Sequence, residues 1–186
     1  QYGNQRKGNI DTLKIFCEKN KIELEEIGLI LNDHNSNKIS SSAIRENLKS
    51  GKFELANKDL ERNFSVAGKV IKGDQRGRTI GIPTANLEYP LNTITIPYGV
   101  YAVETLIEGN TYFGIVNFGI RPTFNKDKPI VEAYLFDFDN DIYDKDIEIL
   151  FHKQIRQEKK FNDIKELLNQ INIDIAEAKK ILKYGN

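Results

Sequence analysis

From Phe64 onward, the chain consists largely of short runs of β-branched and aromatic residues separated by glycine, proline or asparagine. These runs cover residues 64–71, 98–107, 112–118, 130–138 and 146–155. Runs of this kind predict strands, and Glu108-Gly109-Asn110 between two of them predicts a hairpin turn. Because no helical pattern separates the strands, we expect an antiparallel barrel, whose closure leaves no unpaired edge strand.

A helix is expected after the last strand, between residues 161 and 184. Its apolar residues recur at helical spacing, at Phe161, Ile164, Leu167, Leu168, Ile171 and Ile175. The pattern predicts an amphipathic helix that packs on the barrel, and Asn172 marks the position of a potential break.

The first 40 residues contain residues that begin and end helices, and they show little alternation of apolar and polar residues. Asn9 or Asp11 is suited to cap a helix that carries Leu13, Phe16 and Cys17 on one face, with Cys17 buried. The stretch from Leu24 to Leu31 predicts a short buried strand.

Two more helices are expected before the first strand of the barrel. Ser41 or Ser42 is a natural N-cap for a helix that ends near Gly51, and residues 53–61 form another short helix. A helix–strand–helix segment cannot close a sheet alone. We therefore predict an α+β protein, in which residues 1–61 are an α/β remnant of a nucleotide-binding domain and residues 62–186 are an antiparallel Greek-key, or split, β-barrel with a C-terminal helix.

The composition favours a small-molecule partner. Lysine plus arginine and aspartate plus glutamate number 27 each, so no global field attracts nucleic acid or an anionic membrane. The single cysteine, Cys17, excludes an internal disulfide. No apolar run reaches the roughly 18 residues of a membrane span. We expect a cytoplasmic protein without a nucleic-acid or membrane partner.

The richest candidate site lies between residues 68 and 86. Glycines let the backbone approach a ligand closely, and this segment holds Gly68, Gly73, Gly77 and Gly81. Lys72 and Arg78 supply charge for an anion, while Thr84 and Asn86 supply oxygens suited to a hard cation such as Mg²⁺. The segment predicts a nucleotide-phosphate site, and a glycine-rich hairpin with a Thr/Asn turn is the alternative. Neither the Walker A nor the dinucleotide-binding pattern occurs in it.

Glu132 is the candidate general base. In the run 130–138 it alternates with Ile130, Tyr134 and Phe136, which places a carboxylate on a largely apolar face. Burial there would raise its pKa towards the range useful for accepting a hydroxyl proton. A glutamate exposed at the start of an edge strand explains the pattern equally well.

The glycine-rich segment, with Gly81-Ile82-Pro83-Thr84-Ala85-Asn86 at its end, resembles the signature of riboflavin kinase, or flavokinase. Further parts of that signature follow in order, and the resemblance covers roughly residues 62–183. These parts are Pro97-Tyr98-Gly99-Val100-Tyr101, Asn117-Phe118-Gly119-Ile120-Arg121-Pro122-Thr123-Phe124, Val131-Glu132-Ala133 and Ile155-Arg156-Gln157-Glu158-Lys159-Lys160-Phe161.

The resemblance implies that ATP and riboflavin are converted to FMN and ADP, with Glu132 as the catalytic base. It also implies that Thr84 and Asn86 hold Mg²⁺. The ATP-binding residues would be Gly68, Lys72, Gly73, Gly77, Arg78 and Thr84. A flavin-binding barrel without phosphotransfer activity is the alternative function.

The flavin side of the site is also implied by the resemblance. Arg121 would belong to the flavin-side flap in the loop 117–128, and the alternative is a solvated loop charge. Arg156 and Glu158 would bond to the isoalloxazine, and Phe161 would offer a ring beside it. The alternative is a plain strand end followed by the charged start of a helix, with Phe161 in the core.

The upstream part resembles the end of the adenylyltransferase domain of bacterial bifunctional riboflavin kinase/FAD synthetases, through Arg6-Lys7-Gly8 and Lys38-Ile39-Ser40-Ser41-Ser42-Ala43-Ile44-Arg45. By this resemblance Ser41, Ser42 and Arg45 form part of a second ATP site, although simple helix capping explains the serines equally well. The chain contains no His-x-Gly-His motif. FMN adenylylation is therefore expected only of a longer chain.

Overall fold

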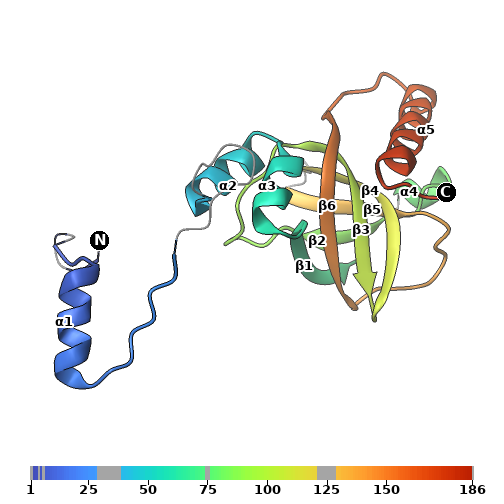
Figure 1. The fold of residues 1–186 in the computed structure, drawn as a ribbon. Coiled ribbons are helices and arrows are strands. Elements are labelled where there is room, and N and C mark those ends of the chain that lie inside the picture. Colours follow the sequence, from blue (N-terminus) through green and yellow to red (C-terminus); the bar gives the residue numbers. More distant parts are fainter. Residues whose placement is uncertain are drawn as a thin grey trace. The chain divides into compact units, whose positions relative to one another are not determined.

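The structure, a computed structural model, describes residues 2–3, 5, 7–28, 39–73, 76–120 and 129–185, with Arg76 and Thr79 described by their backbone alone. The chain divides into two compact units, Gln1–Ile39 and Ser40–Asn186. Figure 1 traces both along the chain, from blue to red, and each is described by itself below. The second unit contains the barrel, together with two helices that precede it in sequence.

The first unit is built around α1 (Ile10–Asn20). Asn9 caps it as predicted, because the Asn9 side chain accepts a hydrogen bond from the Thr12 amide at 2.9 Å, while the Thr12 hydroxyl accepts from the Asn9 amide at 3.0 Å. This reciprocal capping box satisfies two amides that the first helical turn would otherwise leave unpaired. Cys17 is buried as predicted, whereas Phe16 is 57% exposed and does not share its buried face.

The predicted strand at 24–31 is wrong for the residues that the structure describes. Residues 24–28 have no regular structure, Ile27 is 81% exposed, and residues 29–31 lie outside the described residues. A strand needs a partner for its backbone N–H and C=O groups. Among the described residues of this unit, the only strand-like pairing is the bridge between Tyr2 and Gly8.

Helices α2 (Ser41–Lys49) and α3 (Phe53–Leu60) belong to the same unit as the barrel. The N-cap of α2 is Ser40, one residue before the predicted cap, and its hydroxyl accepts a hydrogen bond from the Ala43 amide at 3.2 Å. Phe53 of α3 is fully buried, with its ring centroid 5.2 Å from that of Tyr101 and 6.0 Å from that of Phe151. These contacts fix α3 against the barrel.

Six antiparallel strands close the barrel in the order β1-β2-β5-β4-β3-β6. Their bounds are β1 Phe64–Ile71, β2 Ala85–Glu88, β3 Gly99–Ile107, β4 Asn110–Ile120, β5 Pro129–Leu135 and β6 Asp146–Gln157. Strands β3, β4 and β5 follow one another as neighbours, and β6 returns beside β3, which is the predicted Greek-key arrangement.

Three details of the strands differ from the sequence prediction. The four-residue strand β2 was not predicted, because it is short and its flanking prolines, Pro83 and Pro90, resemble loop punctuation. Strand β4 continues to Ile120, so residues 117–120 belong to a strand and not to the predicted loop. Strand β5 ends at Leu135, before Asp137, whose φ of 50° is incompatible with a strand.

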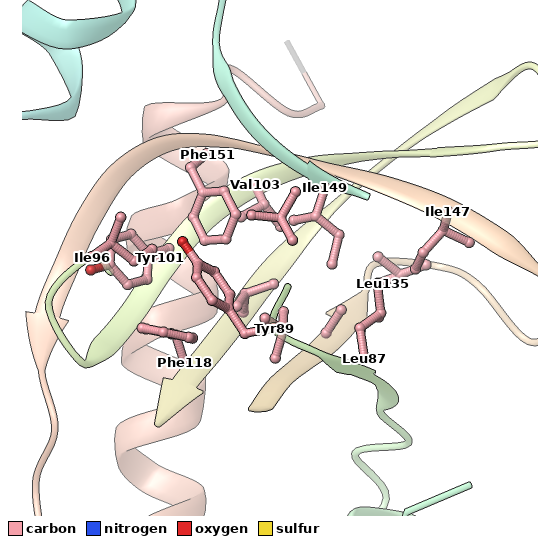
Figure 2. Close-up of a cluster of buried hydrophobic side chains, with 14 of the residues drawn as sticks. Leu87, Tyr89, Ile96, Tyr101, Val103, Phe118, Leu135, Ile147, Ile149 and Phe151 are labelled. Atoms are coloured by element: carbon pink, nitrogen blue, oxygen red, sulfur yellow. The ribbon is translucent and has the colours of Figure 1, made fainter. Parts of the chain in front are cut away.

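The inside of the barrel is filled by alternate residues of the strands. Figure 2 shows apolar side chains of this interior from several strands, including Leu87 of β2, Tyr101 of β3, Phe118 of β4 and Phe151 of β6. Because strand side chains alternate between two faces, filling the interior in this way turns the intervening residues outward.

Helix α5 (Ile164–Ile181) covers part of the outside of the barrel. It begins at the N-cap Asp163, whose carboxylate accepts a hydrogen bond from the Glu166 amide at 2.8 Å, and it continues through Asn172 without a break. Ala178 packs there in a second apolar cluster with Val100, Ala102, Ile115 and Phe136. The outer surface of the barrel therefore has an apolar part beneath α5.

Among the described residues, none of the helices has the length and apolar character that crossing a membrane requires.

Replacing Phe53 with alanine is expected to lower the free energy of unfolding of the barrel unit by about 3–5 kcal/mol, because it leaves a cavity between α3 and the barrel. Chemical denaturation followed by circular dichroism measures this change. Leu55→Ala on the same helix is the control, since Leu55 is 53% exposed. Equal losses for the two variants would show that α3 does not dock through Phe53.

Candidate active site

A row of polar side chains crosses three neighbouring strands on the outer face of the barrel. The strand register places Glu132 of β5 between Asn86 of β2 and Asn117 of β4. The Asn117 amide nitrogen lies 3.5 Å from a carboxylate oxygen of Glu132. The row faces outward because Val131 and Ala133, on either side of Glu132, point into the core and are at most 1% exposed.

Gly73 lies directly against one end of this row. A Cβ atom at this position would lie 2.3 Å from the Asn86 amide nitrogen and 2.9 Å from its oxygen, so only glycine leaves room for the Asn86 side chain. Asn86 is 3% exposed, and its amide nitrogen donates a hydrogen bond to the Thr84 carbonyl at 3.3 Å. Gly73 and the Thr84–Asn86 pair therefore meet beside Glu132.

A cavity of about 220 Å³ opens next to Thr84. Its wall contains Arg78 and Pro83 on one side and Ala133 of β5 on another, and the 138–143 segment completes it. The full lining is Val70, Arg78, Pro83, Thr84, Ala85, Ala133, Leu135, Phe138, Asp139, Asn140, Asp141, Ile142 and Tyr143. Thr84 thus joins the cavity to the polar row, because it lines the first and contacts Asn86 of the second.

The backbone around Arg78 is folded tightly. Gly77 and Arg78 form part of the single helical turn α4 (Arg76–Thr79), and the Ile82 amide donates to the Gly77 carbonyl at 2.8 Å. A Cβ atom at Gly77 would lie 2.2 Å from the Ile82 carbonyl oxygen. Glycine at this position therefore allows the turn that brings Arg78 to the cavity.

The other two predicted ATP-binding residues lie outside this group. Gly68 is within β1, opposite Ile147, and a Cβ atom there would make only ordinary contacts, the nearest at 3.6 Å. Lys72 is exposed just after β1. The cavity lining includes neither residue.

On the flavin side of the predicted site, the carboxylate of Glu158 lies over the backbone of β4. A Cβ atom at Gly119 would be 2.0 Å from a carboxylate oxygen of Glu158. Gly119 is two residues after Asn117, so both face the same side of β4. Glu158 is therefore brought to the outer face that carries Glu132.

Phe161 and Arg156 contact each other. The guanidinium carbon of Arg156 lies 5.6 Å from the centroid of the Phe161 ring, and the Lys159 ammonium lies 5.3 Å from it. Arg121 lies outside the described residues, so its role in riboflavin binding stays a prediction.

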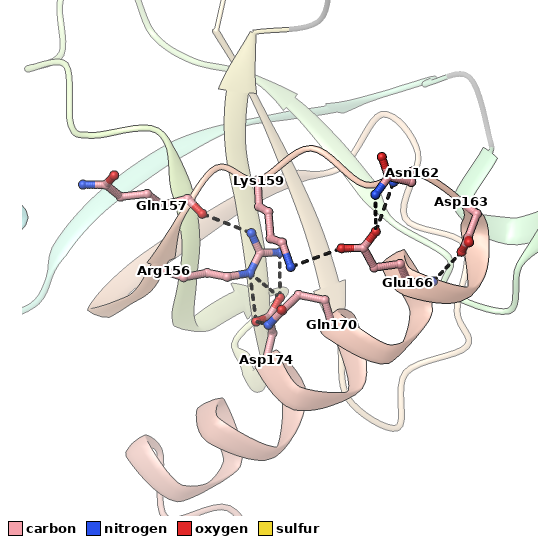
Figure 3. Close-up of polar contacts among 8 residues, drawn as sticks. All are labelled: Arg156, Gln157, Lys159, Asn162, Asp163, Glu166, Gln170 and Asp174. Carbon is pink, nitrogen blue, oxygen red and sulfur yellow. Dashed lines mark hydrogen bonds and ion pairs between the residues drawn. The ribbon is translucent and has the colours of Figure 1, made fainter.

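Arg156 also forms an ion pair with Asp174 of α5, shown in Figure 3. Nε of Arg156 donates to both carboxylate oxygens at 3.0 Å, and Nη2 donates to one of them at 2.8 Å. The Asp174 residue is 1% exposed. This pair links the end of β6 to the helix that covers the barrel.

The residues of the predicted second ATP site lie at the start of α2. Ser41, Ser42 and Arg45 are all exposed, and none of them lines the cavity. Their assignment to an adenylyltransferase site, and that of residues 1–61 to such a domain, stay predictions.

Two residues of the site were not singled out from the sequence. Asn117 could have been found as a polar residue between Ile115 and Gly119 on one face of an apolar strand. Asp174 could have been found from its spacing. It lies three residues after Ile171 and four residues before Ala178, so it falls on the apolar face of the last helix. A carboxylate at such a position requires a buried partner.

The family model of riboflavin kinase matches residues 60–182. The chain belongs to the riboflavin kinase family. It is 48% identical over 144 residues to the bifunctional riboflavin kinase/FMN adenylyltransferase of Bacillus subtilis, covering 76% of this chain and 46% of that protein. It is 40% identical over 183 residues to the protein of the same name from Buchnera aphidicola, covering 97% of this chain and 58% of that protein.

A solved structure of a macrolide-efflux protein from Streptococcus pneumoniae is also similar, with a TM-score of 0.82 and 29% identity. The match covers 97% of this chain and 57% of that one. The chain spans about half the length of the curated relatives it matches.

Replacing Gly73 with alanine is expected to displace the Asn86 amide, because the new Cβ atom would lie within 3 Å of it. We expect turnover with ATP and riboflavin to fall about 10- to 100-fold while the fold is kept, as for other small displacements in active sites. Product chromatography and circular dichroism measure the two properties. Gly28→Ala is the control, since a Cβ atom there meets nothing within 4 Å. Full activity of the Gly73 variant would show that the Gly73 backbone is not needed in the active site.

Proposed function

We propose that this chain transfers the γ-phosphate of ATP to the 5′-hydroxyl of riboflavin, which gives FMN and ADP. The observation that carries the proposal is the row in which Glu132 lies between Asn86 and Asn117, with the Gly73 backbone against Asn86. Membership of the riboflavin kinase family names the substrates that such a site would take.

Glu132 acts as the general base in this proposal. Phosphoryl transfer to an alcohol needs a group that accepts the hydroxyl proton and holds the oxygen in line with the phosphate. Asn117, 3.5 Å from the Glu132 carboxylate, limits its orientations from one side, and Asn86 lies on the other side. The carboxylate is thus held at the outer face, where an alcohol can reach it.

ATP occupies the cavity beside Thr84 in this proposal. Arg78 in the cavity wall and the tight backbone at Gly77 suit a polyphosphate chain, which would lie away from the carboxylates of Asp139 and Asp141 in the same wall. The γ-phosphate would extend past Thr84 towards Asn86 and Glu132. Riboflavin would approach along the outer face from the side of Gly119, Glu158 and Phe161.

The oxygens of Thr84 and Asn86 fit a magnesium ion. Within the described parts of the chain, no group of three or more His, Cys, Asp or Glu residues could hold a metal. Mg²⁺ in kinases is commonly bound by only one or two protein groups together with substrate phosphates, so these two oxygens suffice. When bound, the ion neutralises charge on the phosphates of ATP.

The protein from which this chain comes is, we propose, also an FMN adenylyltransferase. Its relatives from Bacillus subtilis and Buchnera aphidicola are named for both activities, and the chain spans about half their length. The cytoplasmic location and the lack of nucleic-acid or membrane partners stay predictions from the sequence.

Glu132→Gln is expected to reduce turnover about 10²- to 10⁴-fold, because the amide cannot accept the hydroxyl proton. Riboflavin binding should change little, since the two side chains have the same shape. Chromatography of FMN formed from riboflavin, ATP and Mg²⁺ measures turnover, and quenching of flavin fluorescence measures binding. The matched control is Glu88→Gln, which changes an exposed carboxylate two residues after Asn86 on β2.

Retained turnover in the Glu132 variant would show that Glu132 is not the general base. A wild-type chain that binds riboflavin without forming FMN would contradict the kinase proposal and favour a flavin-binding module.

Asn86→Ala is expected to raise the Mg²⁺ concentration needed for half-maximal turnover about tenfold or more, because one of the two protein oxygens is lost. Titrating Mg²⁺ at saturating ATP measures this requirement. Asn92→Ala, at an exposed turn residue, is the control. An unchanged Mg²⁺ dependence would exclude Asn86 as a metal ligand.

A further inference from the structure

The connection between β6 and α5 carries Glu158 and Phe161, and side chains of α5 hold it at both ends (Figure 3). At its start, Arg156 pairs with Asp174 near the middle of the helix. At its end, Asn162 and Lys159 pair with Glu166 in the first turn. Helix α5 therefore determines where this connection lies.

The contact at Asp174 is the stronger of the two. The Asp174 carboxylate is buried and receives three hydrogen bonds from Arg156, as well as one from the Gln170 amide at 3.0 Å. Two nitrogens of one guanidinium bonded to one carboxylate fix both distance and plane. A buried carboxylate without this partner would be strongly destabilising, so the arrangement has little freedom.

The contact at Glu166 is exposed and supports the same connection. Its carboxylate accepts from the Asn162 amide at 3.1 Å, and the Lys159 ammonium lies 3.3 Å away. The Asn162 hydrogen bond, followed by Lys159, lowers the pKa of Glu166 below its ordinary value. Solvent weakens such exposed pairs, so Asp174 dominates the anchoring.

Hydrogen bonds within the protein hold the Arg156 guanidinium at every nitrogen and leave two of its five N–H groups for a ligand. Nε and Nη2 bond to Asp174, and Nη1 donates to the Gln157 carbonyl at 3.1 Å, so each of its three nitrogens is engaged. Its guanidinium carbon lies over the Phe161 ring, 5.6 Å from the ring centroid. The orientation of Arg156, set by Asp174, is thus passed directly to Phe161.

We propose that Asp174 is a positioning residue for riboflavin. It holds Arg156, and through Arg156 it fixes the ring of Phe161, which faces the flavin. This inference rests on the proposed function, because it takes riboflavin as the ligand of that face. Asp174 does not touch the substrate, and its effect is on flavin affinity and not on phosphoryl transfer.

The test compares Asp174→Asn with the wild-type chain at a temperature below the Tm of every variant used. The amide has the shape of the carboxylate but loses its charge and one acceptor oxygen, so Arg156 is no longer fixed. We expect the Kd and KM for riboflavin to rise about tenfold, with kcat at saturating riboflavin and KM for ATP within about threefold. Glu177→Gln, which removes an exposed carboxylate from the same helix, should change none of these.

A double-mutant cycle with Phe161→Ala tests the route of the effect. If Asp174 acts through Phe161, Asp174→Asn should raise the riboflavin Kd less than about twofold once the ring is absent. An Asp174→Asn variant with a lower Tm but an unchanged riboflavin Kd would overturn the proposal, as would additive effects in the cycle. Should Asp174→Asn not fold, Asp174→Glu carries the same comparison, because it keeps the charge and displaces the carboxylate.

The Kd measurement separates this inference from the proposed function. A wild-type chain that binds riboflavin but forms no FMN would contradict the kinase activity, while the change in Kd on Asp174→Asn would still test the positioning role. A wild-type chain that does not bind riboflavin would overturn both.

Discussion

The pairing of the four-residue strand β2 with β5 is the constraint on which the site depends. It closes the barrel between β1 and the rest of the sheet, and it sets Asn86 opposite Glu132. Side chains of a strand alternate with a period of two, so a slip of one residue would turn Glu132 into the core and Val131 out to solvent. The apolar filling of the barrel, with Leu87 and Val131 fully buried, opposes that slip. Core packing therefore fixes the orientation of the Glu132 carboxylate, which we propose as the general base.

The outer face of the barrel is shared between two uses. Its apolar part, including Ala102 and Ile115, is covered by α5, while its polar part carries Asn117 and Glu132. The connection from β6 to α5 crosses between the two parts and places Glu158 over Gly119. The helix thus shields apolar strand residues and also supports the segment that we assign to riboflavin. These two roles explain why α5 carries a buried ion pair as well as the apolar contacts of its Ala178 cluster with the barrel.

The sequence predicted the antiparallel barrel and its last helix, because period-two runs and helical spacing are local signals. It also brought Gly73, Thr84, Asn86 and Glu132 into one hypothesis, and the structure places them together. It did not predict β2, which is too short to show a period and forms because β1 and β5 supply partners. The strand expected at 24–31 failed for the opposite reason: an apolar run without a partner strand does not form one in the described residues. Asp174 was missed because its role depends on Arg156, a contact between residues that become neighbours only after folding.

A buried ion pair is weak evidence for stability, because removing two charges from water offsets most of their attraction. Two apolar residues of similar size in place of Arg156 and Asp174 could hold α5 to the barrel about as well. They could not fix the plane of a side chain that packs on Phe161, since apolar contacts have no preferred direction. The directional hydrogen bonds of the guanidinium supply that orientation. The pair is therefore better explained by the orientation that it gives to the side chain beside Phe161, which we assign to riboflavin, than by its contribution to the free energy of folding.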